Sequence, residues 1–302
     1  MRSSTRASDT PSARPAEPAA RHESYWGAAW RRLCRHHLAM VGLGIIGAII
    51  LLAVFAPYVS PADPLAIDYA HTAAPPGAPG HVLGTDAVGR DILARLIYGT
   101  RVSLQVGIVA VGIAATLGTA VGLTAGYYGG VVDNVLMRTV DVFLAFPVIV
   151  LAIAIIAVLG PSLVNVMIAL GLVAWTTYAR VVRGQVLILR ELDFVQAARA
   201  AGTGDARIIV RHILPNAVSA IIVAATLRVA SSIITESGLS FLGFGVQPPT
   251  PTWGNMLKNA QDQMITAPWT AIFPGVFIFI TVIAINYIGD GLRDALDPRH
   301  VR

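Results

Sequence analysis

Residues 194–216, FVQAARAAGTGDARIIVRHILPN, form a short arginine-rich stretch between two apolar parts of the chain. Asp193 followed by Gln196 matches a capping box, which marks the start of a helix. Gly202 supplies a residue for the left-handed conformation that ends a helix after about two turns. The sequence therefore predicts a short helix that is bounded by Asp193 and by a bend at Gly202.

A second short helix is expected directly after this bend. Either Thr203 or Asp205 can cap its start, and Pro215 either breaks it or lies in the first turn of the next span. Its apolar side would carry Ile208, Ile209 and Ile213. Isolated helices below about 12 to 15 residues are marginal in water, so the pair needs a surface to dock on. The charge pattern alone fits an ordinary solvated basic loop equally well.

The composition of the whole chain indicates a membrane protein. It is 55% hydrophobic and 13% charged with a mean hydropathy of +0.66, whereas soluble domains have about 25% charged residues. The basic residues border apolar runs, so we expect contact with membrane lipid and no nucleic-acid partner. Cys34 is the single cysteine, which excludes an internal disulfide.

The apolar runs predict an all-α, polytopic membrane fold with six transmembrane helices. Gly160 to Ser162 divide the uncharged run from Val142 to Ala179 into two spans. The other four spans are placed at Leu38 to Ala56, within Val102 to Val132, at Asn216 to Glu236 and at Thr270 to Gly289.

Three parts of the chain follow from this division. Residues 1–30 are expected to be a disordered tail. Residues 31–101 hold the first span, a proline-rich outer loop and an amphipathic surface helix over Gly89 to Arg101. Residues 102–302 hold a core of five spans, with the arginine-rich stretch in a loop at about 190–215.

The distribution of basic residues predicts the orientation. With the N-terminus inside, 17 Lys and Arg residues lie on the inner side and four on the outer side. Because cytoplasmic loops are enriched in Lys and Arg, both termini and the arginine-rich stretch are expected in the cytoplasm.

The spacing of the arginine-rich stretch matches a known pattern. Gln196, Ala197 and Ala198 precede Gly202 by three residues, and His212, Leu214 and Pro215 follow after nine more. This order resembles the cytoplasmic coupling loop of ATP-binding-cassette importer permeases, in which the first position is usually Glu. Residues 83–104 and 239–254 resemble two further segments of the branch that comprises dipeptide, oligopeptide and nickel permeases, and the resemblance covers roughly residues 30–300.

The resemblance implies a permease subunit of the bacterial inner membrane that forms the path for dipeptides or oligopeptides. Its partners would be a homologous second permease, two cytoplasmic ATP-binding subunits and an extracytoplasmic substrate-binding protein. ATP and Mg²⁺ would bind to the partner ATPases, and this chain would hold no cofactor. The residues that would contact an ATPase are Gln196, Ala197, Ala198, Arg199, Gly202, Arg207, His212, Leu214 and Pro215.

Glycines and the only lysine argue against nucleotide binding by the chain itself. Lys258 lacks the Gly-rich turn and the following Ser or Thr of a phosphate-binding loop. Gly42, Gly44 and Gly47 match a dinucleotide-binding spacing, but they lie within an apolar span and are interpreted as helix-packing residues. A second set recurs every fourth residue and predicts close helix packing, either within the bundle or against the sister permease: Gly118, Gly122 and Gly126.

No enzyme site or metal site is expected. Histidines are scattered, with His36 and His37 at a membrane edge and His22 and His300 in the tails. Asp86 and Asp91 in the outer loop are interpreted as capping and ion-pairing residues at a helix start.

Charges within spans are the candidates for a translocation path. Arg228 and Glu236 lie in the predicted fifth span, about 12 Å apart along a helix, so direct pairing is not expected. Asp141 is placed at the inner end of the third span. The open alternatives are an ion-coupled secondary transporter or channel that uses Arg228 and Glu236, a structural membrane anchor, and a nickel or other small-solute cargo.

Overall fold

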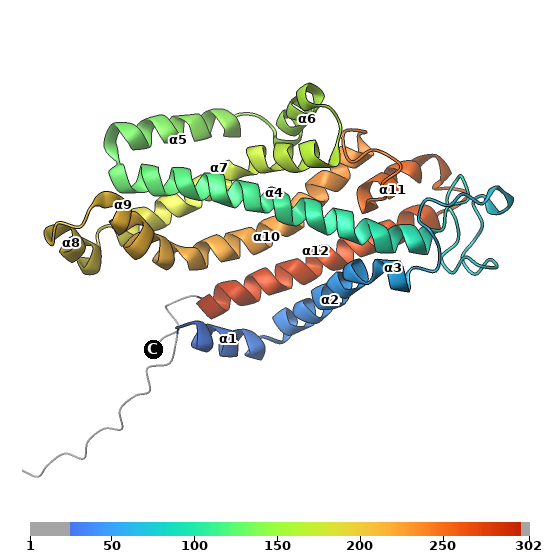
Figure 1. Cartoon of the computed structure of the whole chain (residues 1–302), viewed down its shortest axis with the longest axis horizontal. Helices are drawn as coiled ribbons and strands as arrows, with labels where there is room; N and C mark the ends of the chain where they lie inside the picture. Colours follow the sequence, from blue (N-terminus) through green and yellow to red (C-terminus); the bar gives the residue numbers. More distant parts are fainter. Residues whose placement is uncertain (1–24, 297–302) are drawn as a thin grey trace, which may run out of the picture.

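The computed structural model describes residues 25–296, and these residues form helices connected by loops (Figure 1). In chain order the helices are α1 Tyr25–Arg35, α2 His37–Val54, α3 Ala56–Val59, η1 Tyr69–His71, α4 Ile92–Tyr128, α5 Gly130–Leu144, α6 Val148–Leu159, α7 Leu163–Leu189, α8 Asp193–Ala200, α9 Asp205–Ile208, η2 Ile209–Ile213, α10 Leu214–Phe241, α11 Trp253–Asn259, η3 Gln261–Gln263 and α12 Trp269–Leu296.

The predicted N-terminal tail is partly wrong. Residues 25–30 belong to α1, whose last turn carries Arg32 and Arg35. Leu33 in α1 packs against the C-terminal part of α12. The rest of the predicted tail, together with His22 and His300, lies outside the described residues.

Membrane-crossing length is reached by five helices in the described chain: α2, α4, α7, α10 and α12. A sixth span results if α5 and α6 are counted as one span, although they are bent by 90°. The bend lies at Pro147, which has no N–H to continue α5 and which disfavours a helical conformation of the preceding Phe146. The sequence-based division therefore overlooked that the third span is broken, while the turn at Gly160 is confirmed.

The separate surface helix at residues 89–101 is also wrong. Helix α4 runs without a break from Ile92 to Tyr128, so this segment is the N-terminal end of the second span. Asp91 caps α4, since its Oδ1 accepts a hydrogen bond of 2.7 Å from the amide of Ala94. Ile92 and Leu96 are buried in a cluster with residues of α2, α10, α11 and α12.

The closest helix pair consists of α4 and α7. A Cβ atom on Gly118 would lie 2.4 Å from the backbone oxygen of Trp175, and one on Gly122 would lie 2.6 Å from that of Ala179. Gly126 meets Val186 at 2.7 Å in the same way. All three glycines thus face α7 of the same chain, and their missing side chains permit the close approach.

Helix α2 packs on α12 through one glycine of the predicted set. A Cβ atom on Gly42 would lie 2.5 Å from the backbone oxygen of Ala284. Gly44 and Gly47 have no described atom within 4 Å of such a position, so the interpretation of these two as packing residues within the chain is wrong.

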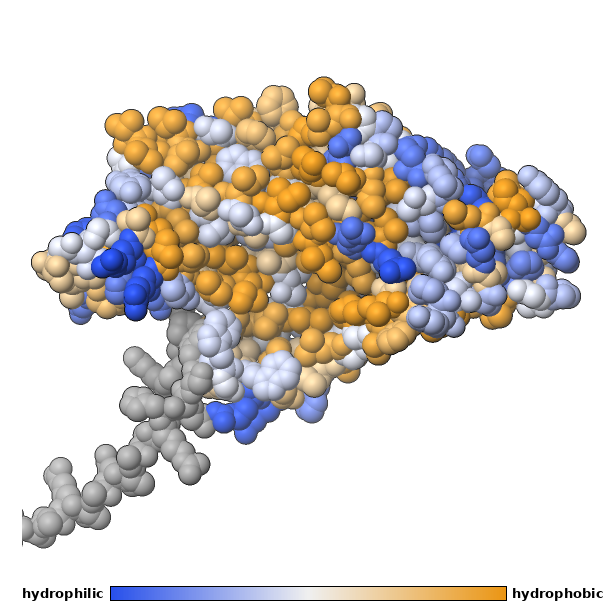
Figure 2. Space-filling view, in the orientation of Figure 1, coloured by the Kyte–Doolittle hydropathy of each residue, from blue (hydrophilic) through white to orange (hydrophobic). Residues whose placement is uncertain are grey.

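The surface of the molecule fits a bilayer. Figure 2 shows apolar residues over the middle of the bundle, with polar residues gathered toward its two ends. Exposed apolar side chains on α4, α6 and α12 include Ile108, Val158 and Phe279. An apolar surface of this extent is expected where lipid, rather than water, surrounds the helices.

Candidate functional site

The arginine-rich stretch forms α8, α9 and η2 at one end of the bundle (Figure 1). Gly202 has a φ of +76° and ends α8 as predicted. The amide of Thr203 donates to the oxygen of Ala198, and the amide of Gly202 donates to that of Arg199. This pair of bonds is the Schellman arrangement, which satisfies carbonyls that the helix end leaves free.

The predicted caps of the two short helices are wrong. Asp193 is the first residue of α8, and no side chain caps that helix. The Gln196 amide instead donates a 2.9 Å hydrogen bond to the oxygen of Arg190, which ties α8 to the end of α7. Gly204 is the N-cap residue of α9, so neither Thr203 nor Asp205 acts as its cap.

The second short helix is not separate from the following span. Helix α9 continues through the π-helical segment η2 into α10, and the amide of Leu214 bonds to the oxygen of Ile209, five residues earlier. Pro215 lies in the first turn of α10, where the lack of an N–H is tolerated and where the wider π turn relieves the clash of its ring with the preceding turn. A force on α9 therefore acts directly on α10.

The stretch is anchored on the ends of α4 and α7. Val195, Ile208 and Ile213 are fully buried in a cluster that also contains Leu123, Tyr127, Val182 and Val186. These contacts provide the docking surface that such short helices require.

A polar clamp reinforces this anchoring. The Tyr127 hydroxyl donates a 2.7 Å hydrogen bond to Oδ1 of Asp205, and the guanidinium of Arg199 lies 5.5 Å from the centre of the Tyr127 ring. Tyr127 thus contacts α8 through Arg199 and α9 through Asp205. The clamp lines a cleft of about 380 Å³ that Arg190 and Glu191 border from the end of α7.

The side of the stretch that faces away from the bundle is exposed and basic. Of the residues predicted to contact an ATPase, Ala198, His212 and Leu214 are half-buried. The others are exposed: Gln196, Ala197, Arg199, Gly202, Arg207 and Pro215. Arg207 has no ion-pair partner among residues 25–296. The predicted contact residues thus lie in one continuous stretch but do not share a single face.

Ion pairs connect α5 to α7 near this end. Arg183 binds Asp133 through both carboxylate oxygens, at 2.5 and 2.6 Å. Asp141, which the sequence placed at the inner end of the third span, pairs with Arg180 at 2.7 Å. Helix α5 is therefore attached to α7 by ion pairs as well as by apolar contacts.

The two charges proposed for a translocation path lie apart from each other. Nη2 of Arg228 donates to the Thr177 hydroxyl at 3.2 Å, which joins α10 to α7. Glu236 is 1% exposed, and its Oε1 accepts hydrogen bonds from Ser240 at 2.7 Å and from Thr252 at 3.3 Å. The second oxygen of Glu236 is buried without a hydrogen-bond partner in the described chain.

Sequence reasoning missed the polar cluster around Glu236. Helix α11 turns back into the bundle, where Thr252 and Asn255 form a capping box and Trp253 is fully buried. The Trp253 amide donates a 3.2 Å hydrogen bond to the hydroxyl of Ser103 in α4, and the indole N–H donates to the oxygen of Leu96 at 3.3 Å. The Thr-Trp-Gly-Asn run was the available signal, since Thr followed three residues later by a polar side chain predicts a helix start.

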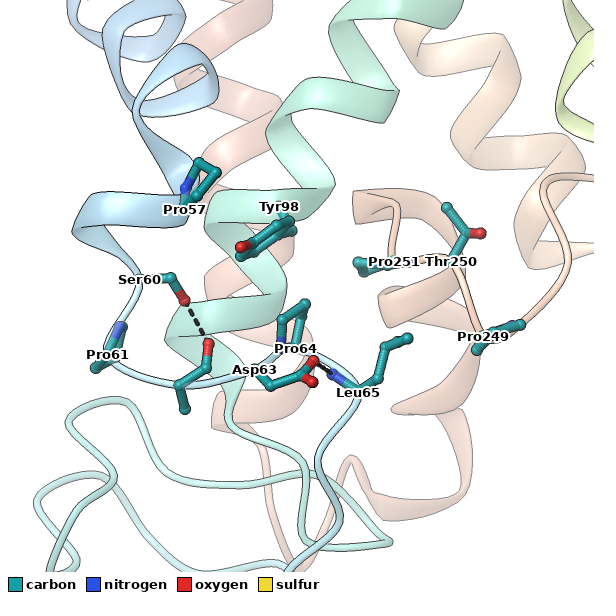
Figure 3. Close-up of a pocket in the computed structure, with 11 residues that line it drawn as sticks. Pro57, Ser60, Pro61, Asp63, Pro64, Leu65, Tyr98, Pro249, Thr250 and Pro251 are labelled. Carbon is teal, nitrogen blue, oxygen red and sulfur yellow. Dashed lines mark hydrogen bonds between the residues drawn. The ribbon is translucent and has the colours of Figure 1, made fainter.

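The end of the bundle opposite α8 and α9 carries two further features (Figure 1). One is a cavity with a volume of about 650 Å³. Figure 3 shows its lining residues, which come from α4 at Tyr98, from the Pro57 to Leu65 segment and from the loop at Pro249 to Pro251. Among residues 25–296, Asp63 is the only charged residue that lines the cavity.

The scattered histidines predicted no metal site, and the structure brings two of them together with an aspartate in the loop between α3 and α4. Asp68, His71 and His81 offer ligand atoms that all lie within 4.8 Å of one another. The scattered spacing hid this group because the loop between residues 71 and 81 folds back. Asp86 and Asp91 act as expected, the first by pairing with Arg90 at 2.7 Å and the second as a helix cap.

Family models match most of the chain. Residues 118–302 match the binding-protein-dependent transport system inner membrane component, and residues 24–76 match the N-terminal TM domain of oligopeptide transport permease C.

Two curated relatives are similar along nearly the full length. A glutathione transport system permease protein, GsiD, of Pectobacterium atrosepticum is 46% identical over 275 residues, which are 91% of each chain. A dipeptide transport system permease protein, DppC, of Alkalihalophilus pseudofirmus is 46% identical over 289 residues, 96% of this chain and 95% of that protein.

A solved structure shares the fold. An inward-facing form of the MetNI methionine ABC transporter superposes with a TM-score of 0.55 at 21% identity, covering 67% of this chain and 96% of that chain.

Proposed function

Since the chain belongs to the family of inner membrane components of binding-protein-dependent transport systems, we propose that it is one of two permease subunits that form the path for dipeptides or oligopeptides. The names of two 46% identical relatives, a dipeptide permease and a glutathione permease, support a peptide cargo. Neither a nickel cargo nor an ion-coupled mechanism receives support from these relatives. Arg228 and Glu236 also bond to different residues and not to each other, which fits poorly with a shared gating role.

The observation that carries the proposal is the attachment of the arginine-rich stretch to three long helices. Its α8 is bonded to the end of α7, its Asp205 is bonded to α4, and its α9 continues into α10. A cytoplasmic ATPase that moves this stretch would therefore move α4, α7 and α10 together. Rigid-body motion of this kind is a recognised way to alternate access in transporters.

The partners that we propose are a homologous second permease, two ATP-binding subunits that supply ATP and Mg²⁺, and an extracytoplasmic binding protein. The exposed residues Gln196, Ala197, Arg199 and Arg207 would contact one ATPase, with Gly202 setting the angle between the two arms. The chain itself would carry out no catalysis. Both termini and the arginine-rich stretch would face the cytoplasm, as the excess of basic residues on that side supports.

Arg228 is proposed to face the path. Its described hydrogen bond goes to a neutral hydroxyl, so its charge remains available to a substrate carboxylate. A charge within a span is costly unless it faces water or a partner, which favours such a position.

Uptake into proteoliposomes tests the proposal. The chain is co-purified with its second permease and ATP-binding subunits, and labelled dipeptide or glutathione is supplied with the binding protein. We expect uptake that requires ATP on the side of the arginine-rich stretch and that continues when an uncoupler dissipates the proton gradient. Uptake that stops with the uncoupler while ATP remains would contradict the proposal.

A pair of tyrosine variants tests the clamp within the same assay. Tyr127→Phe removes the hydroxyl that bonds to Asp205, whereas Tyr128→Phe removes a neighbouring hydroxyl with no described bond. A hydrogen bond to a charged group is worth about 1.5 to 3 kcal/mol, and less at an exposed carboxylate such as this one. We expect Tyr127→Phe to lower peptide uptake per ATP hydrolysed severalfold, and Tyr128→Phe to leave that ratio unchanged. Equal ratios in both variants would exclude the clamp as a connection between the ATPase and α4.

A further inference from the structure

We propose that Asp68, His71 and His81 form a binding site for one resident Zn²⁺ ion in the loop between α3 and α4. Two imidazoles and one carboxylate match the nitrogen and oxygen ligands that Zn²⁺ prefers over Mg²⁺ and Ca²⁺. Three protein ligands would leave a fourth position to water. The site does not depend on the proposed transport function.

All three ligand atoms lie within 4.8 Å of one another, and two of their distances lie near the spacing of a tetrahedral ion. Zinc bonds of about 2.0 to 2.1 Å place two ligand atoms about 3.3 Å apart. Oδ2 of Asp68 lies 2.8 Å from Nδ1 of His71 and 3.8 Å from Nε2 of His81, so these two distances lie on either side of that spacing. The His71 ring is 42% exposed and can rotate to complete the geometry.

The partner of His81 determines which of its nitrogens is free. Nδ1 of His81 lies 2.9 Å from Oδ2 of Asp91, which is 2% exposed, so this nitrogen donates to the carboxylate. Nε2 is then the nitrogen that faces Asp68, and in a neutral ring it carries a lone pair. A carboxylate behind a histidine in this manner orients metal-binding imidazoles and raises their basicity.

Two negative charges meet at the site without a basic partner. Among residues 25–296, neither Asp68 nor Asp91 pairs with Lys or Arg, whereas the nearby Asp86 pairs with both Arg90 and Arg95. Oδ2 of Asp68 and the free nitrogen of His81 are both acceptors, so a cation between them resolves their contact. A divalent ion also neutralises the two carboxylates.

The surrounding loop holds the ligands in place before any ion binds. The amide of Asp68 donates to the oxygen of Gly89 at 3.3 Å, and Oδ1 of Asp68 caps η1 by accepting from Ala70 at 2.9 Å. The Thr85 hydroxyl donates to the oxygen of His71 and accepts from the amide of Ala74. A preorganised set of ligands loses less entropy on binding.

The position of the site connects it to the bundle. Oδ1 of Asp91 caps α4 while its Oδ2 binds His81. An ion at this site would therefore attach the outer loop to the start of α4, the helix that also carries Tyr127 at its other end.

The test is a Zn²⁺ titration of the full-length chain in detergent. The chain is purified by a tag without histidines, in a Cys34→Ser background that removes an exposed thiol, and is stripped with a chelator. Zn²⁺ affinity is then measured by competition with a chromogenic chelator. We expect one ion per chain, and the visible absorption of tetrahedral Co²⁺ when Co²⁺ replaces it.

The variants make the test specific. His71→Ala and His81→Ala should each weaken binding by about 100-fold or more, and Asp91→Asn, which retains a helix cap, by about 10- to 100-fold. His37→Ala, an exposed histidine away from the loop, should leave the affinity unchanged.

Asp68→Asn guards against loss of folding, because an amide oxygen still caps η1 while its ability to bind Zn²⁺ falls. A monodisperse Asp68→Asn chain that binds Zn²⁺ more than tenfold more weakly supports the site. Unchanged affinity in Asp68→Asn, or a wild-type chain that binds no more Zn²⁺ than the His71→Ala/His81→Ala double variant, would overturn it.

Discussion

Replacement of Gly202 by valine should uncouple ATP hydrolysis from peptide uptake. Gly202 has a φ of +76°, and no described atom lies within 4 Å of the position that a Cβ would occupy. A valine there would therefore be strained by its backbone conformation and not by a clash. A residue held in such a conformation costs about 1 to 3 kcal/mol, with β-branched residues at the upper end.

The magnitude follows from this strain. Each 1.4 kcal/mol changes an equilibrium tenfold, so the population of the bent conformation would fall by about 5- to 150-fold. If the bend transmits the movement of the ATPase, uptake per ATP hydrolysed should fall by a comparable factor. Insertion of the chain should be unaffected, because the buried contacts of Val195 and Ile208 lie on either side of the bend.

The assay is peptide uptake and ATP hydrolysis measured on the same proteoliposomes. Gly204→Val is the matched control, because Gly204 is also free of neighbours within 4 Å but has a φ of −67°, which valine adopts readily. Gly202→Asn should fall between the wild type and Gly202→Val, since asparagine tolerates positive φ better than other residues do. Normal uptake by Gly202→Val, or an equal loss in Gly204→Val, would refute the role of the bend.

Two further predictions concern stability. Gly118→Val places atoms against the backbone of Trp175 and should destabilise the bundle by at least about 1 to 3 kcal/mol, whereas Gly112→Val on the same helix enters open space. The melting temperature of each variant in detergent, followed by fluorescence, tests this. Equal melting temperatures would show that α4 and α7 are not held at this distance. Thr252→Val removes the cap of α11 and a hydrogen bond to Glu236, so it should lower the free energy of unfolding by about 1 to 2 kcal/mol. Thr250→Val, the control, should lower it by less than about 0.5 kcal/mol. The same melting assay applies, and equal stability of the two variants would contradict this prediction.

Local sequence signals predicted the parts of the molecule that depend on neighbouring residues. The apolar runs placed the long helices, because a bilayer demands about 20 apolar residues for each crossing. Gly202 ended α8 as predicted, because only the backbone of that residue has to adopt a positive φ. The resemblance of three separated segments to peptide permeases agrees with the family match and with the relatives.

Local signals failed where distant residues compete with near ones. Asp193 and Asp205 were predicted as caps, but the first is already within α8 and the second is bound by Tyr127, 78 residues away in the chain. The surface helix at residues 89–101 was predicted from its apolar side, but Ile92 and Leu96 are buried among residues of other helices and α4 continues unbroken to Tyr128. A rule that considers only a few adjacent residues cannot predict the contact between Tyr127 and Asp205 or the packing of residues 89–101.

The sequence alone therefore determined the class of the fold, the helical spans and the bend, since these follow from hydrophobicity and from backbone preferences within one turn or one span. Only the tertiary structure decided that Asp68, His71 and His81 meet, that Glu236 is enclosed beneath α11, and that Tyr127 holds the stretch after α7. Each of these contacts requires the closure of a loop or the docking of two helices, and such closure depends on the packing of the whole chain.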